Sequence, residues 1–151
     1  MTVSVDQIKA LREETGAGIA DCREALTSSE GDMVKAKEFL KKKGIDKASS
    51  KSDREVKAGL VDSYVHSNRV GVLVEVLCET DFVAKTDDFK TLTHEIAMQI
   101  ASMQPETVEE LLKQDYIRDS SQTMEHLIKS AVAKLGENIQ VGKFSRLELG
   151  K

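Results

Sequence analysis

The stretch LCETDFVAKTDDF, residues 77–89, changes from a strand pattern to a helix pattern. Its first two residues end a run in which apolar residues alternate, and from Phe89 onward the apolar residues recur at spacings of three and four, which is typical of a helix. Phe82 precedes Phe89 by seven residues, so periodicity alone favours a core position for both rings. However, Lys85 and Thr86 interrupt the stripe, and a junction between two elements can direct a side chain outward. Two positions for Phe82, core and surface, are therefore open at this point.

Strand patterns lie on both sides of this junction. GLVDSYVHS (59–67) and RVGVLVEVLCE (69–79) are rich in β-branched residues, and Ser67 and Asn68 predict a hairpin turn between them. NIQVGKFSRLELG (138–150) predicts a third strand. Because the helical patterns fall between the second and third strands, we expect an α+β fold, in which a three-stranded antiparallel sheet has its helices packed on one face.

Three helices are expected between the second and third strands. Each begins with a side chain that can cap a helix, and the first and third end near a residue that breaks one. The signals, in chain order, are Thr86 to Pro105, then Thr107 with Glu110, then Asp119 with Gln122 followed by an apolar stripe ending at Gly136.

The N-terminal residues predict three short helices. Ser4 with Gln7 forms a capping box for the first, TGAG (15–18) breaks the chain, and Asp32 caps a third helix that ends at Gly44. Helices this short are not stable alone, so we expect them to pack as a compact bundle.

A polar segment separates this bundle from the strands. It is poor in apolar periodicity, which suggests a connecting helix or linker. We therefore expect three parts: a three-helix bundle at 1–45, a linker at 46–58 and an αβ core domain at 59–151.

The second face of the predicted sheet is also apolar, and the expected helices do not cover it. An apolar sheet face of this size is seldom left in water. Two covers are open: a second copy of the chain, or the N-terminal bundle folded back over the sheet. The residues expected on this face are Leu60, Tyr64, Leu73, Leu77 and Phe144.

Charge is distributed unevenly along the 151 residues, whose formal net charge is −4. Residues 41–57 contain seven basic and three acidic side chains, a local balance of +4, so the remainder sums to −8. Such a segment can contact RNA or an acidic protein surface, or it can be a solvated helical linker.

Composition argues against several kinds of site. Cys22 and Cys78 have no partner at the spacing of a zinc site or a disulfide framework, which fits a reducing cytosol. The N-terminus has no apolar signal core, and no run approaches the ~20 apolar residues of a membrane span. We expect a soluble, cytoplasmic protein with no metal, no other cofactor and no membrane contact.

No catalytic constellation is found in the sequence. His66, His94 and His126 are scattered, and we find no phosphate-binding loop, dinucleotide fingerprint, nucleophile elbow or HExxH motif. None of the aromatic residues lies in the basic segment 41–57, which weakens a base-stacking role in RNA recognition. We therefore expect function by binding, without catalytic residues and without direct nucleotide binding.

Three motifs follow one another along the chain: LREETGAGIADCREAL (11–26), VGVLVEVLCETDFVAK (70–85) and AVAKLGENIQVGKF (131–144). In this order they closely resemble the signature of the translation elongation factor Ts family, and the match runs nearly end to end. The central ETDFVA block is specific, whereas the N-terminal block also fits a generic ubiquitin-associated (UBA)-like bundle.

The resemblance implies a guanine nucleotide exchange factor, which releases GDP from elongation factor Tu so that GTP can bind. Asp81, Phe82, Val83 and Ala84 match the family segment that intrudes beside the magnesium site of that GTPase. With the resemblance, Phe82 is expected to reach the partner rather than its own core.

The resemblance also implies that the UBA-like bundle docks on the GTPase domain of elongation factor Tu. Many members have two methionines where Ile19 and Ala20 stand here, so apolar character is only partly kept. The contacts implied for this chain are Arg12, Ile19, Ala20, Arg23 and, in the linker, Lys51.

Longer members of the family carry a second copy of the αβ core, whereas this chain stops shortly after the third strand. Its similarity to short members implies a homodimer that pairs through the sheets. Some short relatives carry a cysteine near the end of the last strand, where Ser145 lies here, so the dimer is expected to be noncovalent.

An alternative function is an RNA-associated or adaptor protein that uses the helical bundle and the basic segment 41–57. It predicts a steep salt dependence of RNA binding, because each neutralised phosphate releases counterions. An exchange factor predicts instead that added GDP competes with complex formation.

Overall fold

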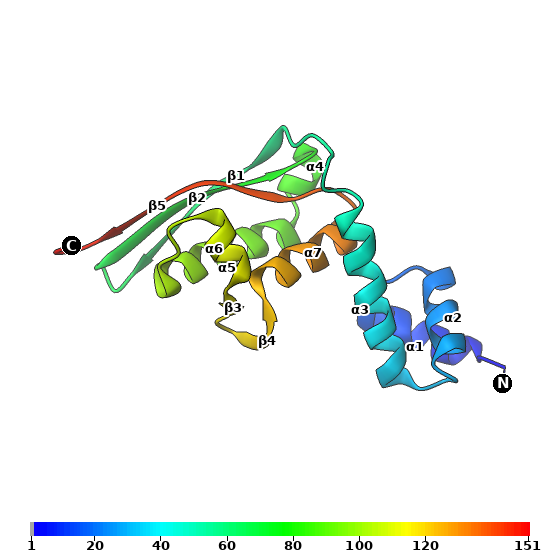
Figure 1. Cartoon of the computed structure of the whole chain (residues 1–151). Helices are drawn as coiled ribbons and strands as arrows, with labels where there is room; N and C mark the ends of the chain where they lie inside the picture. Colours follow the sequence, from blue (N-terminus) through cyan, green and yellow to red (C-terminus); the bar gives the residue numbers. More distant parts are fainter. Residues whose placement is uncertain (1) are drawn as a thin grey trace.

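The computed structural model describes residues 2–151. Figure 1 shows a small helical bundle at one end of the molecule and, beside it, a sheet with helices on one side. The bundle contains α1 (Val5–Thr15), α2 (Ile19–Ser28) and α3 (Met33–Ser49). As predicted, Ser4 and Gln7 form a capping box on α1, and the Asp32 side chain accepts hydrogen bonds from the first turn of α3.

The bundle has a small apolar core of its own. Apolar residues three or four positions apart lie on one face of a helix, and these faces of the bundle helices pack together. The buried residues include both large aliphatic and small side chains. They are Ile8, Leu11, Cys22, Ala25, Leu26 and Ala36. Cys22 is therefore a buried small hydrophobe, with its sulfur directed at the Ala17 carbonyl oxygen 3.7 Å away.

The third helix does not end at Gly44 as predicted but continues to Ser49. Gly44 lies where α3 passes against α7 (Met124–Leu135), and a Cβ added at Gly44 would lie 3.2 Å from the Cβ of Ala133. Glycine thus serves close helix packing here instead of terminating the helix. Ala48, one turn further on, is buried in the core of the sheet-containing body, so α3 joins the bundle to the body.

The predicted three-stranded antiparallel sheet is confirmed. It consists of β1 (Ala58–His66), β2 (Val70–Cys78) and β5 (Gln140–Glu148) in the order β1-β2-β5. β2 pairs antiparallel with both neighbours, and its register with β5 shifts between Val74 and Val76. Burial of Val72, Val74 and Val76 on one face of β2 accounts for their apolar character, whereas Leu73 on the other face is exposed.

One face of the sheet is covered by helices, as Figure 1 shows. They are α4 (Asp81–Ala84), α5 (Asp87–Met103), α6 (Val108–Lys113) and α7. The main core lies between these helices and the inner face of β2. Its fully buried members include Val74, Val76, Phe89, Ile96, Ile100, Leu111 and Met124.

The opposite face of the sheet is open. Val61, Val65, Leu73 and Leu147 lie on it with more than half of each side chain exposed. Leu60, Tyr64 and Phe144 were expected there, but they pack against the main core. Side chains alternate along a strand, so an error of one residue in reading the pattern moves a side chain to the other face.

The N-terminal bundle does not fold back over this open face. In Figure 1 the bundle lies beyond the end of the sheet, and its link to the body is the contact of α3 with α7. The alternative in which the bundle covers the sheet is therefore wrong. The continuous helix α3 explains this, because a chain that stays helical through Ser49 cannot turn back on itself.

A second difference concerns residues 115–123. The predicted helix start at Asp119 with Gln122 is wrong: β3 (Asp115–Tyr116) and β4 (Asp119–Thr123) form a small hairpin, and Thr123 caps α7. The Gln99 side chain of α5 holds this hairpin, since it donates to the Asp115 carbonyl oxygen and accepts from the Ile117 amide, both at 3.0 Å. Tertiary contacts thus override the local capping signal.

Gly59 in β1 provides a test of the sheet geometry. Its φ is 148°, and a Cβ at this position would lie 2.2 Å from the Val76 carbonyl oxygen. We expect Gly59→Ala to lower the free energy of unfolding by about 2–4 kcal/mol through backbone strain and overlap with β2. Urea unfolding monitored by circular dichroism measures this change.

Gly71→Ala is the matched control, because a Cβ there meets no atom within 4 Å. We expect it to change the free energy of unfolding by less than about 0.5 kcal/mol. Equal losses in the two variants would contradict the described register of β1 and β2.

Candidate partner-binding site

The short helix α4 separates neighbouring side chains onto opposite sides. Phe82 is 88% exposed, whereas Val83 and Ala84 are 9% and 3% exposed and belong to the main core. Asp81 is also exposed. Two of the four residues predicted for partner binding therefore face solvent, and the other two hold the helix on the body.

Phe82 does not continue the apolar stripe of α5, because it lies on α4, which is a separate helix. The Thr86 hydroxyl donates to the Val83 carbonyl oxygen at 2.7 Å and accepts from the Phe89 amide at 3.2 Å. Thr86 thus ends α4 and caps α5 with one side chain. A core position for Phe82, which periodicity alone favoured, is wrong.

The other end of α4 is held by the turn between α7 and β5. Thr80 is the N-cap of α4, and its hydroxyl accepts from the Val83 amide at 3.4 Å. The Glu137 carboxylate accepts from the amides of Glu79 and Thr80, at 3.2 and 2.9 Å, and from the Thr80 hydroxyl at 2.7 Å. Residues 58 positions apart in sequence therefore fix the start of α4.

Asn138 extends this contact to the linker. Its amide donates to the Glu79 carboxylate at 2.8 Å, and its side-chain nitrogen donates to the carbonyl oxygens of Arg54 at 2.7 Å and Ser52 at 3.3 Å. No role for Glu137 or Asn138 was predicted from the sequence. The signal available was their place in the GEN triplet, directly after the helix-ending Gly136.

Cys78 lies beneath the same junction. Its sulfur is 3.2 Å from the Thr80 carbonyl oxygen, and burial, reinforced by the negative charge of Glu137, raises the pKa of the thiol. The thiolate, which is the reactive form, is therefore disfavoured, and Cys78 serves as packing below α4.

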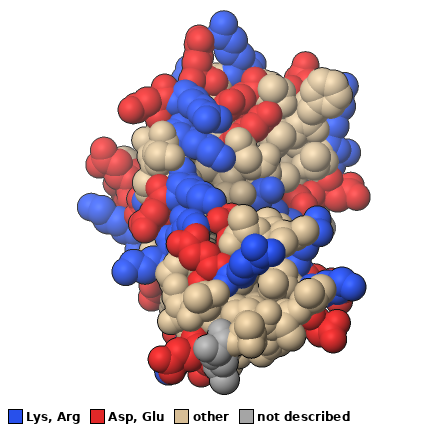
Figure 2. All heavy atoms as spheres, turned by 90° about the vertical axis from the view of Figure 1, so that its right-hand side faces the viewer, with Lys and Arg blue, Asp and Glu red and all other residues tan. Residues whose placement is uncertain are grey.

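The residues implied for docking of the bundle lie at its surface. Arg12, Ala20 and Arg23 are exposed, and Ile19, the first residue of α2, is 52% exposed. Figure 2 views the molecule from the bundle side, where Lys and Arg atoms form an irregular band with carboxylates and uncharged surface beside it. This face combines positive charge with accessible apolar groups.

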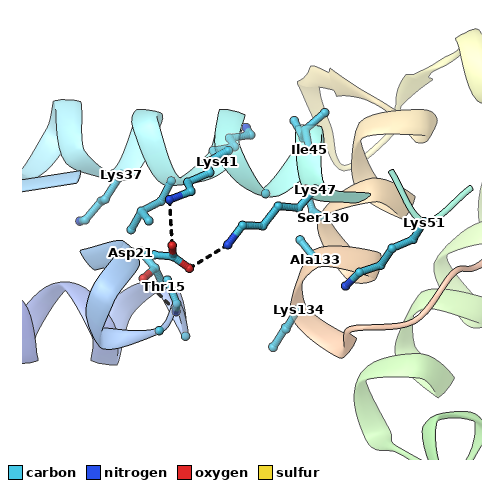
Figure 3. A pocket seen from close by; sticks show the side chains of 16 residues that line it. Thr15, Asp21, Lys37, Lys41, Ile45, Lys47, Lys51, Ser130, Ala133 and Lys134 are labelled. Carbon is cyan, nitrogen blue, oxygen red and sulfur yellow. Dashed lines mark hydrogen bonds and ion pairs between the residues drawn. The ribbon is translucent and has the colours of Figure 1, made fainter. Parts of the chain in front are cut away.

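A cleft of about 340 Å³ separates the bundle from the body. Figure 3 shows Asp21 within it, facing Lys47. The Asp21 carboxylate accepts hydrogen bonds from Lys43 at 2.9 Å and from Lys47 at 3.0 Å. Both bonds lower the pKa of Asp21, and the bond from Lys43 has the larger effect. Part of the positive charge of residues 41–57 is thus neutralised within the molecule.

Lys51 connects the linker to the turn at residues 136–138, which holds the start of α4. Its Nζ lies 3.3 Å from the carbonyl oxygen of Gly136, the residue before Glu137. The turn at residues 136–138 therefore touches both Lys51 and the cap of the Phe82 helix. Arg12, Ile19, Ala20 and Arg23 lie apart from this turn, on the bundle.

Other kinds of site find little support in the part of the chain that the structure describes. Residues 2–151 contain no group of three or more His, Cys, Asp or Glu side chains that could hold a metal ion. Among the described helices, none has the length and apolar character needed to cross a bilayer.

The chain is similar to proteins of one family. A family model described as Elongation factor TS matches residues 79–151. Elongation factor Ts of Fervidobacterium nodosum is 41% identical over 197 residues, a match that covers all of both chains. Elongation factor Ts of Rippkaea orientalis is 42% identical over 196 residues, which cover 99% of this chain and 79% of that protein.

The chain is shorter than the matched region of these relatives. The Fervidobacterium match extends over 197 residues, whereas this chain has 151, so 46 positions have no counterpart here. Elongation factor Ts of a Nostoc species is 48% identical over 148 residues, which are 97% of this chain and 47% of that protein. The matched regions include the Phe82 helix and the turn at residues 136–138.

The contrast between Phe82 and Phe89 predicts opposite effects on stability. We expect Phe82→Ala to change the free energy of unfolding by less than about 0.5 kcal/mol, since removing the ring breaks few apolar contacts within the chain. Phe89→Ala removes a ring that is 0% exposed and should cost about 3–5 kcal/mol. Thermal and urea unfolding of both variants measure the difference, and comparable losses would show that Phe82 is packed in solution.

Proposed function

The chain belongs to the elongation factor Ts family, and from this premise we propose that it promotes the release of GDP from elongation factor Tu. It does so as a binding protein, without catalytic residues and without contacting the nucleotide itself. The helix α4 presents Asp81 and Phe82 to the GTPase domain beside its magnesium and nucleotide site. The bundle supplies a second contact through Arg12, Ile19, Ala20 and Arg23, and the linker contributes Lys51.

The observation that carries this proposal is the exposure of Phe82 on a supported helix. A large apolar side chain in water has an unfavourable hydration free energy that a partner can remove. The ring is 88% exposed, yet the next two residues are buried and the helix is capped at its start. The ring is therefore accessible, and its attachment to the body is fixed.

Exchange needs negative coupling between two ligands of the GTPase. If the factor weakens GDP binding by some ratio, GDP weakens binding of the factor by the same ratio. The factor must therefore bind the GDP-free GTPase more tightly than the loaded one. Inserting a side chain where the magnesium and phosphate contacts are made meets this requirement by geometry, without any bond or proton transfer.

The free energy that Phe82 supplies is limited. Burying one phenylalanine contributes about 1.5–3 kcal/mol, whereas a thousandfold change in affinity requires about 4 kcal/mol. The contacts of the bundle and linker must supply the remaining binding energy. Both contact regions are therefore necessary for exchange.

The RNA-associated alternative receives less support. Lys43 and Lys47 pair with Asp21, Lys43 also contacts Glu24, and Lys51 binds a backbone carbonyl. Cations engaged within the chain are less available to release counterions from a phosphate backbone.

We also propose that two chains associate through the open sheet face. Val61, Val65, Leu73 and Leu147 form an exposed apolar surface there, and an isologous contact between two copies would bury it twice. Both cysteines are buried, so the dimer would be noncovalent. In Figure 1 this face is opposite the helical layer, so pairing would not cover α5 or α7.

For Phe82→Ala, we expect GDP release at saturating factor to slow by about tenfold or more, because the lost burial free energy corresponds to that ratio. Release of fluorescent GDP from elongation factor Tu measures the rate. Val34→Ala is the control, since Val34 is also exposed but lies at the start of α3. Unchanged release in the Phe82 variant would remove the proposed role of the ring.

For Leu73→Glu, we expect the dimer to dissociate, because two charges would be buried in its apolar centre. Sedimentation velocity at micromolar concentration should give a dimer for the unaltered chain and a monomer for the variant. Val34→Glu, which adds the same charge away from the sheet, should leave the dimer intact. A monomer for the unaltered chain at this concentration would argue against the proposed association.

A further inference from the structure

The helix that carries Phe82 cannot fix its own orientation. It has four residues, fewer than an isolated helix needs for stability in water. Val83 and Ala84 anchor its inner side in the core and so place Phe82 on the outer side, but they do not hold its N-terminal end. The orientation of Phe82 thus depends on what holds the residues just before it.

Glu137 supplies that support with both carboxylate oxygens. Oε1 accepts from the Glu79 amide at 3.2 Å and the Thr80 amide at 2.9 Å, and Oε2 accepts from the Thr80 hydroxyl at 2.7 Å. Hydrogen bonds to a carboxylate are about twice as strong as those between neutral groups. A single side chain therefore holds the two residues that lead into α4.

The bond to the Thr80 hydroxyl also sets the direction of the helix cap. Because the hydroxyl proton is directed at Glu137, an oxygen lone pair is left for the Val83 amide, 3.4 Å away. Glu137 thus orients the cap, and the cap orients the turn on which Phe82 lies.

Glu137 is itself held on a rigid turn. It follows Gly136, which ends α7 with φ 78°, and precedes Asn138, whose amide donates back to the Glu79 carboxylate. Asn138 also binds the linker carbonyl oxygens of Arg54 and Ser52. The carboxylate is thus fixed between the body and the linker.

We propose that Glu137 is a positioning residue for nucleotide exchange, which acts through the Thr80 cap to hold Phe82 in the direction needed for insertion. This rests on the function proposed for Phe82 and adds a residue that does not contact the partner. A purely stabilising residue would affect folding, whereas a positioning residue affects the exchange step and loses its effect when the ring is absent.

The test uses Glu137→Gln and Phe82→Ala, singly and together, in the full chain. Glutamine keeps the volume of the side chain but leaves one acceptor oxygen in place of two. We expect Glu137→Gln to lower the rate of GDP release at saturating factor by about three- to tenfold, with the half-saturating concentration of factor changed by less than about twofold. In the Phe82→Ala background, the added substitution should have no further effect on the rate.

Glu125→Gln is the matched control, because it makes the same charge change in the first turn of α7, where Glu125 pairs only with Lys129 among the described ion pairs. It should leave the rate of GDP release unchanged. If Glu137→Gln is unfolded by circular dichroism at the assay temperature, Thr80→Val removes the same hydroxyl contact. It is expected to slow release only when Phe82 is present.

Three results would overturn the inference. They are an unchanged rate in folded Glu137→Gln, an equal slowing with and without the Phe82 ring, and a change confined to the half-saturating concentration. If Phe82→Ala alone leaves release unchanged, the function proposed for the ring fails first. The two proposals are therefore separable within one set of measurements.

Discussion

Burial of Val83 and Ala84 beneath the end of β2 is the constraint on which the other features of the site depend. These two residues must lie in the core for α4 to be attached at all, and the geometry of a single helical turn then directs the preceding side chain away from it. Within the described residues the Phe82 ring is 88% exposed, so contacts there offset little of the unfavourable hydration of its apolar surface. The fold thus exposes an apolar ring that can be buried only by another molecule.

The rest of the molecule restricts the freedom of that group. The sheet gives α5 a surface to pack on, α7 packs against α5, and the turn at residues 136–138 that follows α7 contacts the start of α4. The same turn binds the linker through Asn138 and Lys51, so the support of the ring and the attachment of the bundle share three consecutive residues. A small protein obtains rigidity in this way with few side chains, because the side chains of Glu137 and Asn138 each make more than one hydrogen bond.

Local signals predicted most of the fold. The three strands alternate, the stripe of α5 is regular, and Ser4 and Asp32 are strong caps, so each element could be identified from its own residues. The hairpin before α7 could not, because Gln99 of a different helix holds it. Gly44 was misread for a related reason: a glycine that ends a helix and one that permits close packing are the same letter. Phe82 showed the limit most clearly, since a seven-residue spacing fits both one continuous helix and two helices separated by a capping threonine.

The uninterrupted helix α3 has a consequence for partner choice. Its 17 residues span about 25 Å at the rise of an α-helix, and a helix resists compression and extension far better than a flexible linker does. The distance between the bundle and the body is therefore fixed by the helix. A GTPase whose two binding surfaces had a different spacing could contact either the bundle or Phe82, but not both at once. The length of α3 would then be enough to select the partner.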